Sequence, residues 1–163
     1  ICGKMIAERI FAINGDDAFL CGILHDIGLI VELETSEARF FELMDRLAAT
    51  GPTIVDLERE LFATDHGEIG ALLAREWQIA EPVAAAIADH HRTDLVVPPQ
   101  SPAGILQMSE YLVHQLGHGV KEGVPASLAP ELAAHIQANV EEYRAVAEDL
   151  PAEMDRTRQL YGA

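Results

Sequence analysis

The sequence predicts an all-α fold for this chain of 163 residues. Apolar residues recur at intervals of three and four through most of the chain, as in helices that bury one face. Prolines and glycines separate these segments where helices are expected to begin or end. No segment of useful length alternates apolar and polar residues as a strand does. Because 49% of the residues are hydrophobic, we expect one folded domain rather than a disordered chain.

Two helices are expected at the N-terminal end. Residues 1–13 have apolar side chains at helical spacing and lead into an Asn-Gly pair, which is a frequent helix stop. Asp16 or Asp17 can accept the free N–H groups at the start of the next helix. That helix contains the apolar stretch of residues 18–32. The stretch falls short of the roughly 20 apolar residues that a membrane span needs, so no membrane association is expected.

Two further helices follow, each with its own start signal. Ser36 is expected to cap a helix with a stripe of phenylalanine, leucine and methionine, and Gly51 to close it. After the next turn, Thr53 or Asp56 can open a short helix that runs through Leu61.

The middle of the chain carries two more helices and a long loop. Asp65 can cap a helix over residues 66–78. Pro82 suits the first turn of a helix over residues 81–91, because a proline there loses no hydrogen bond. The three prolines of residues 92–103 predict an extended loop.

The C-terminal part is expected to be helical on both sides of a second loop. Residues 104–117 have a helical pattern that ends at Gly117, and residues 117–127 are rich in glycine. From Leu128 onward the tail is rich in alanine and glutamate, which favour helix. Pro151 is expected to break that helix, since proline lacks the N–H group that an interior position donates.

Charge and cysteine content exclude some classes of function. The chain has 27 acidic and 11 basic residues, a formal net charge of −16, and would repel a phosphate backbone. We therefore expect no nucleic-acid partner. Cys2 and Cys21 lie in apolar surroundings without the spacing of a redox pair, which favours reduced thiols in a cytoplasmic protein.

A His-Asp pair interrupts the apolar stretch AFLCGILHDIGLIVE at its centre. Burying an unpaired carboxylate costs several kcal/mol, on the order of 3 to 5. Asp26 therefore needs a partner, which can be a metal ion, a neighbouring cation such as His25, or water at a helix end.

His66 and at least one of the pair His90 and His91 are expected to point inward from helix ends. His66 shares a face with the apolar positions three, seven and eleven residues later, the last of which is Trp77, expected to anchor the core. His90 shares a face with the apolar residues of its own helix, and His91 lies beside it. With the His-Asp pair and a further carboxylate, they would form a mixed nitrogen and oxygen site that suits Fe, Mn, Zn or Mg.

The segments LCGILHDIG and DHGEIGALLAREWQIAEPVAAAIADHH resemble the HD superfamily, and within it the HDOD branch. The resemblance covers residues 1 to about 117 and includes an acid, Glu58, ahead of the second segment. It implies an all-α, HD-superfamily-like helical bundle. Members of the superfamily are metal-dependent phosphohydrolases, whereas HDOD domains act mainly as regulatory output modules in bacterial signalling proteins.

Departures from the catalytic pattern accompany this resemblance. Phosphodiesterases of the HD-GYP branch have a lysine where this chain has Leu29, and a GYP-bearing loop that is absent here. Glu110 occupies the position of an aspartate that completes the metal shell in HD enzymes. An earlier histidine ligand would lie ahead of Ile1, so the chain is expected to be a fragment of a larger HDOD domain.

The resemblance and its departures together predict one domain over residues 1–163. Residues 1–117 would form an HD-like core, and residues 128–163 a C-terminal helical extension. We expect a regulatory interaction module of bacterial signal transduction, without catalytic activity, whose partners are other signalling domains or proteins. The alternative is a metal-dependent phosphohydrolase acting on a nucleotide or cyclic dinucleotide. A residual divalent-metal site would comprise His25, Asp26, His66, His90, His91 and Glu110.

Overall fold

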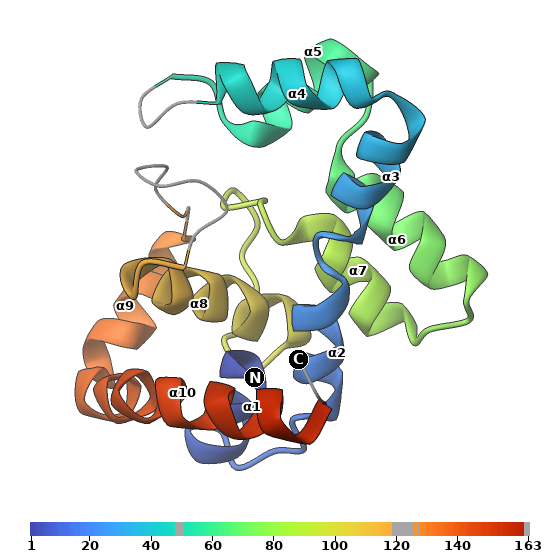
Figure 1. The fold of residues 1–163 in the computed structure, drawn as a ribbon. Helices are drawn as coiled ribbons and strands as arrows, with labels where there is room; N and C mark the ends of the chain where they lie inside the picture. The colour runs from blue at the N-terminus through green and yellow to red at the C-terminus, as the bar shows by residue number, and fades with distance from the viewer. Residues whose placement is uncertain (48–50, 119–125, 127, 162–163) are drawn as a thin grey trace.

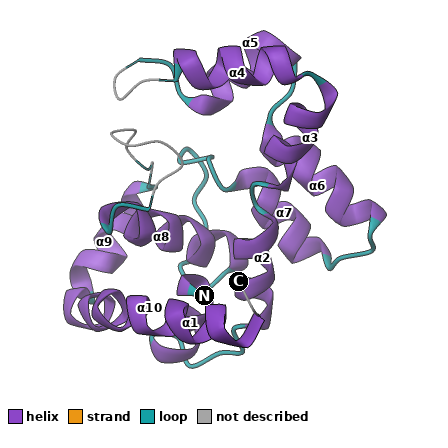
Figure 2. Cartoon of the chain, in the orientation of Figure 1, coloured by secondary structure: helices purple, strands orange, loops and turns teal. Residues whose placement is uncertain are grey.

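The computed structural model describes residues 1–47, 51–118, 126 and 128–161. In these residues all regular structure is helical and no strand is found (Figure 2). The predicted all-α class is therefore confirmed. The helices in chain order are α1 (Cys2–Arg9), α2 (Asp16–Leu24), α3 (Ile27–Thr35), α4 (Glu37–Arg46), α5 (Ile54–Phe62), α6 (His66–Glu76), α7 (Glu81–Asp89), α8 (Pro102–Gln115), α9 (Pro130–Ala138) and α10 (Val140–Tyr161). None of these described helices is long and apolar enough to span a bilayer.

Several helix starts follow the predicted capping chemistry. The Thr53 hydroxyl accepts the N–H of Asp56, whose carboxylate in turn accepts the N–H of Thr53, so the two residues form a capping box. Asp65 accepts the N–H of Glu68 at the start of α6. Pro82 lies in the first turn of α7, as expected.

Other helix ends differ from the sequence-based prediction. The first helix ends at Arg9 rather than residue 13, and the side chain of Asn14, not an aspartate, accepts the N–H of Asp16. Ser36 precedes α4 without a side-chain cap, and α4 ends at Arg46. Of the segment that was expected to continue to Gly51, residues 48–50 lie outside the described residues.

The predictions for the C-terminal tail and for helix α6 also need correction. Helix α10 continues through Pro151 instead of ending before it. Trp77 is 54% exposed at the end of α6 and does not anchor the core. The buried face of α6 consists mainly of four small residues, Gly67, Gly70, Ala71 and Ala74. Their small size lets α6 and α7 approach closely.

Three hydrophobic clusters of described residues lie among the helices, whose arrangement Figure 1 shows. The first cluster joins α1 and α8 to α9 and α10, so the C-terminal helices share a core with the first helix. The second lies among α2, α6, α7 and α8. The third lies between α4 and α5 alone and contains Leu43, Leu47 and Leu57.

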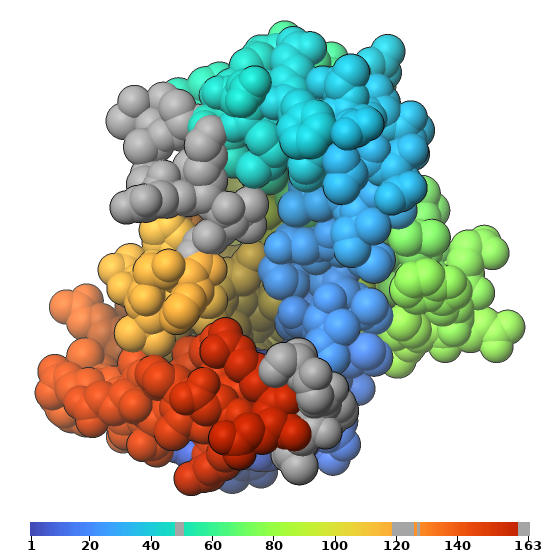
Figure 3. Space-filling view, in the orientation of Figure 1, coloured from blue at the N-terminus to red at the C-terminus, as the bar shows by residue number. Residues whose placement is uncertain are grey.

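We call α4 and α5 together the α4–α5 hairpin, residues 37–62. In the space-filling view its cyan and green atoms lie at the top of the molecule, away from the orange and red atoms of α9 and α10 (Figure 3). Helix α3 connects the hairpin to the rest of the molecule, which we call the body, because α3 contacts both α4 and α6. The hairpin therefore projects from the body of the molecule.

The approach of α3 to α6 depends on Gly28. A Cβ atom on this residue would lie 2.6 Å from the Cα and 2.7 Å from the carbonyl carbon of His66, and closer still to its carbonyl oxygen. Because backbone atoms cannot move aside as a flexible side chain can, only glycine allows this contact. The contact places the turn between α2 and α3 beside the start of α6.

Candidate metal centre

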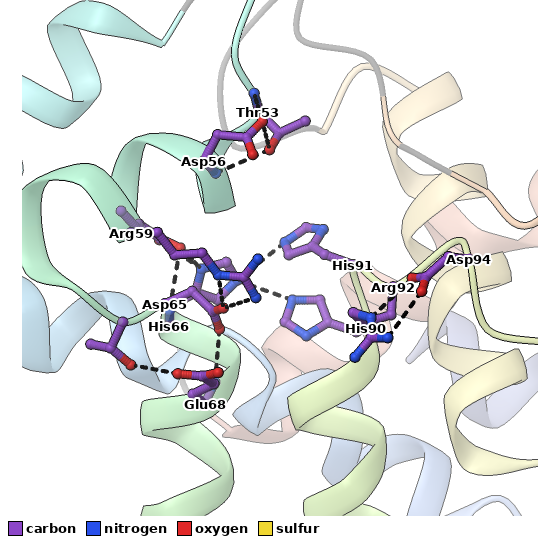
Figure 4. A network of polar contacts seen from close by, with 12 residues as sticks. Thr53, Asp56, Arg59, Asp65, His66, Glu68, His90, His91, Arg92 and Asp94 are labelled. Atoms are coloured by element: carbon purple, nitrogen blue, oxygen red, sulfur yellow. Dashed lines mark hydrogen bonds and ion pairs between the residues drawn. The ribbon is translucent and has the colours of Figure 1, made fainter.

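A cluster of histidines and carboxylates lies where four helix ends and one helix side meet. His25 and Asp26 form the turn between α2 and α3. His66 is the first residue of α6, and His90 and His91 follow the end of α7. Figure 4 shows His66 facing His90 and His91 across the site. Helix α8 supplies Glu110 from its side.

The three ring nitrogens at the centre are close together. The Nε2 atom of His66 lies 3.1 Å from Nε2 of His90 and 3.1 Å from Nε2 of His91. Oδ1 of Asp26 lies 3.7 Å from Nε2 of His66 and 3.9 Å from Nε2 of His90. Two nitrogens bound tetrahedrally to one zinc ion at about 2.0 to 2.1 Å lie roughly 3.3 Å apart, so this spacing suits a shared ion.

Hydrogen bonds on the opposite ring nitrogens fix which atoms face the centre as acceptors. Nδ1 of His66 lies 2.7 and 2.8 Å from the two carboxylate oxygens of Glu58, and Nδ1 of His90 lies 2.6 Å from the carbonyl oxygen of Ile87. Oxygens of both kinds accept, so each Nδ1 carries the proton. In neutral rings both Nε2 atoms then present lone pairs to each other, which requires a proton or a metal ion between them.

The protonation tendencies of these histidines differ. Burial alone lowers the pKa of His66, but the hydrogen bond and charge of Glu58 outweigh it and raise that pKa. Burial and the neighbouring histidines lower the pKa of His90 well below its usual value. Burial, followed by the charge on His66, lowers the pKa of His91 to about 4. His90 and His91 are therefore neutral at physiological pH, which is the form of histidine that can bind a metal ion.

His25 and Glu110 form the second half of the cluster. Nε2 of His25 lies 3.2 Å from Oδ2 of Asp26 and 3.4 Å from Oε1 of Glu110. Burial raises the pKa of Glu110 to about 7, against the opposing charge of His25. Although burial opposes ionisation of Asp26, His25 and the other histidines lower its pKa. Asp26 is thus paired with His25 through Oδ2, and its Oδ1 atom faces the central ring nitrogens.

The structure brings all six sequence-predicted residues into one region. Each lies within 4 Å of at least one other member through the atoms given above. Three of them, His66, His90 and His91, satisfy by themselves the spacing of a metal-binding group. Their service as ligands remains a prediction.

Sequence reasoning missed the supporting residues. Glu58 was noted as part of a motif but without a role, and its position on a helix gave no sign that it would hold His66. Glu32 is buried on α3, and burial together with the charge of Glu58 raises its pKa to about 8. Gln107 is fully buried on α8, and its amide donates to the carbonyls of Asp89 and Arg92 at 3.4 Å each.

A cavity of about 930 Å³ adjoins the cluster, between the α4–α5 hairpin and α8. Among the described residues that line it, the arginines are Arg59 and Arg92. Arg59 pairs with Asp65 at 2.8 Å, and Arg92 pairs with Asp94 at 2.9 Å. Both guanidinium groups are therefore engaged by carboxylates in the described part of the cavity wall (Figure 4).

Comparison with known proteins gives three likenesses. Residues 1–93 match the model of the HDOD domain. An uncharacterized protein of Treponema pallidum (strain Nichols) is 32% identical over 75 residues, which is 46% of this chain and 15% of that protein. A crystal structure of a protein from Shewanella amazonensis SB2B, named "Putative phosphohydrolase", has 24% sequence identity and a TM-score of 0.57 over 92% of this chain and 59% of its own. The chain thus spans only part of each relative, and the likeness to the crystal structure shows a common fold.

Proposed function

This chain belongs to the HDOD domain family, and on that basis we propose that it is a regulatory interaction module that binds a divalent metal ion. In the proposal His66, His90, His91 and Asp26 hold the ion, and His25 and Glu110 lie beside it. The module does not hydrolyse phosphoesters, and its partners are other signalling domains or proteins.

The convergence of Nε2 lone pairs is the observation that carries the metal-binding part of this proposal. Glu58 and the Ile87 carbonyl hold the protons on the outer nitrogens of His66 and His90. Outer partners of this kind orient metal-binding histidines in many proteins. Three imidazoles and a carboxylate suit Zn²⁺ and Fe²⁺ best among the ions considered. When bound, such an ion supplies positive charge and a Lewis-acidic centre.

The paired arginines carry the part of the proposal that concerns catalysis. Hydrolysis of a phosphoester needs cations that stabilise charge on the phosphate oxygens. Arg59 and Arg92 are each held by an aspartate. Leu29 lines the cavity at the position where the HD-GYP branch has lysine. The described lining residues therefore offer no unpaired arginine or lysine to a bound phosphate, and the proposal that the module is not catalytic rests on this.

One observation favours the alternative, a metal-dependent phosphohydrolase. The histidine cluster lies beside a cavity large enough for a nucleotide, and ligand pockets span roughly 300 to 1,000 Å³. A module that used its metal only for structure would have no need of this space.

The test compares metal binding with turnover in the purified protein. We expect about one Zn²⁺ per chain by elemental analysis after dialysis, and weaker binding by at least tenfold for His66→Gln. His118→Gln, which changes an exposed histidine at the cavity, is the matched control and should bind as the wild type does. A lack of Zn²⁺ binding by the wild type would overturn the metal site.

Turnover is measured with Mn²⁺, Fe²⁺ or Zn²⁺ and a cyclic dinucleotide or a simple phosphodiester. We expect no metal-dependent cleavage above the rate in protein-free solution. Cleavage that is abolished by both His25→Ala and Asp26→Ala would establish the alternative function instead.

A further inference from the structure

The α4–α5 hairpin has its own hydrophobic core and few described polar contacts with the body. The buried residues of the third apolar cluster all lie within the hairpin: Leu43 on α4, Leu47 directly after α4, and Leu57 on α5. Among the described residues, the hydrogen bonds from α5 to later helices come from Glu58 and Arg59. Two adjacent residues therefore provide the polar connection between the hairpin and the start of α6.

Glu58 makes the more deeply buried of these two connections. Its side chain is fully buried, and its two oxygens lie 2.7 and 2.8 Å from Nδ1 of His66. The backbone N–H of His66 also donates to Glu58, at 3.3 Å. Nε2 of the same ring faces the centre of the cluster. One imidazole thus joins a hairpin residue on one side to the proposed metal position on the other.

Arg59 reinforces this connection at the surface. Its guanidinium binds Asp65 at 2.8 and 3.1 Å, and Asp65 caps the helix that begins with His66. Because Arg59 is half exposed, its ion pair is worth little by itself. The buried contact of Glu58 must therefore be the main polar link.

We propose that Glu58 is a positioning residue that couples two properties of the protein. One is how firmly the α4–α5 hairpin is held against the start of α6, and the other is metal binding by the histidine cluster. The inference rests on the metal site proposed above and specifies how that site is regulated. A cation on Nε2 makes the N–H on Nδ1 of His66 a stronger donor, which tightens its bond to Glu58. Since linkage is reciprocal, a partner that shifts the hairpin changes the metal affinity by the same factor.

The experiment measures amide hydrogen exchange in residues 37–62 of the purified chain, with and without saturating Zn²⁺. Zn²⁺ affinity is measured in parallel by competition with a chelator. The variants are Glu58→Gln, which keeps the shape but removes the charge, and Glu58→Asp, which keeps the charge. Glu60→Gln is the matched control, because Glu60 lies on the same helix and binds Arg46 within the hairpin at 2.6 Å.

We expect Zn²⁺ to slow amide exchange in the hairpin of the wild type and of Glu60→Gln. In Glu58→Gln, Zn²⁺ should leave the exchange rate of the hairpin unchanged. Glu58→Gln should lose about 10- to 100-fold in Zn²⁺ affinity, and Glu58→Asp should recover part of it. Without metal, Glu58→Gln should exchange faster in the hairpin than the wild type. Circular dichroism melts check folding, and if the variant does not fold, the wild-type exchange with and without Zn²⁺ decides the question.

The outcomes separate this inference from the proposed function. Zn²⁺ binding by the wild type with no change in hairpin exchange overturns the coupling and leaves the metal site standing. Absence of Zn²⁺ binding overturns the metal site and the coupling to it. Faster metal-free exchange in Glu58→Gln would in that case still support the role of Glu58 in holding the hairpin to His66. Equal Zn²⁺ affinity in Glu58→Gln and Glu60→Gln removes the positioning role of Glu58.

Discussion

Replacement of Gly28 by alanine should disturb both the fold and the metal centre. The added Cβ would lie 2.6 Å from the Cα of His66, whereas carbon atoms pack at about 3.5 to 4.0 Å. Helix α3 must therefore move by about 1 Å relative to α6. Overpacking of this kind costs typically 1 to 3 kcal/mol, and the backbone origin of the clash favours the upper end. The shift also carries Asp26 away from the ring of His66.

The assay is urea unfolding followed by circular dichroism, together with Zn²⁺ titration. Gly22→Ala is the matched control, because no atom lies within 4 Å of a Cβ on Gly22 in the exposed face of α2. That control should be stabilised by about 0.4 to 1 kcal/mol, since alanine loses less entropy in a helix than glycine. If Gly28→Ala unfolds within about 0.5 kcal/mol of the wild type and binds Zn²⁺ equally well, the close approach of α3 to α6 is not required.

Three further predictions concern buried polar groups. Gln107→Leu should lose about 1 to 3 kcal/mol in urea unfolding, because the carbonyls on either side of the His90 turn lose their donor, whereas Gln115→Leu on the exposed face should change little. Burial raises the pKa of Glu32 to about 8, so its ionisation favours the unfolded state and stability should fall as pH rises from about 4.5 to 8. Glu32→Gln should flatten this decline, and unfolding midpoints at pH 5 and pH 8 that fall equally in both proteins would contradict the assignment. Burial raises the pKa of Cys2 to about 11 and that of Cys21 to about 12, so an aromatic disulfide reagent at pH 8 should label both thiols only after denaturation.

The helical class and most of the helix starts could be predicted because their causes are local. Thr53, Asp65 and Pro82 act within one turn of their own helices, and the structure has them in the expected places. Pro151 was misjudged because its effect depends on tertiary packing: Leu150 beside it is buried in the first hydrophobic cluster, which holds α10 in place. Propensity alone does not include that contribution.

The histidine cluster could be anticipated, but its support could not. Helical spacing and motif order pointed to the inward direction of His66 and His90, which the structure confirms. The face assignment for α6 was nevertheless wrong, since small residues rather than Leu73 and Trp77 form its buried side. The bond from Glu58 to His66 crosses from one helix to another. Such a pairing depends on how helices are arranged in space, which the spacing of residues within each helix does not reveal.

The shared core of the first and last helices bears on how this domain could be trimmed for expression. The matched family segment ends at residue 93, before α8, α9 and α10. Ile6 on α1 belongs to the same buried cluster as Tyr143 and Val146 on α10, and Arg9 binds Asp149 at 2.6 Å. A fragment cut at residue 93 would present this apolar surface of α1 to water and would tend to aggregate. We therefore expect the smallest autonomous folding unit to extend into α10, well beyond the segment by which the family is recognised.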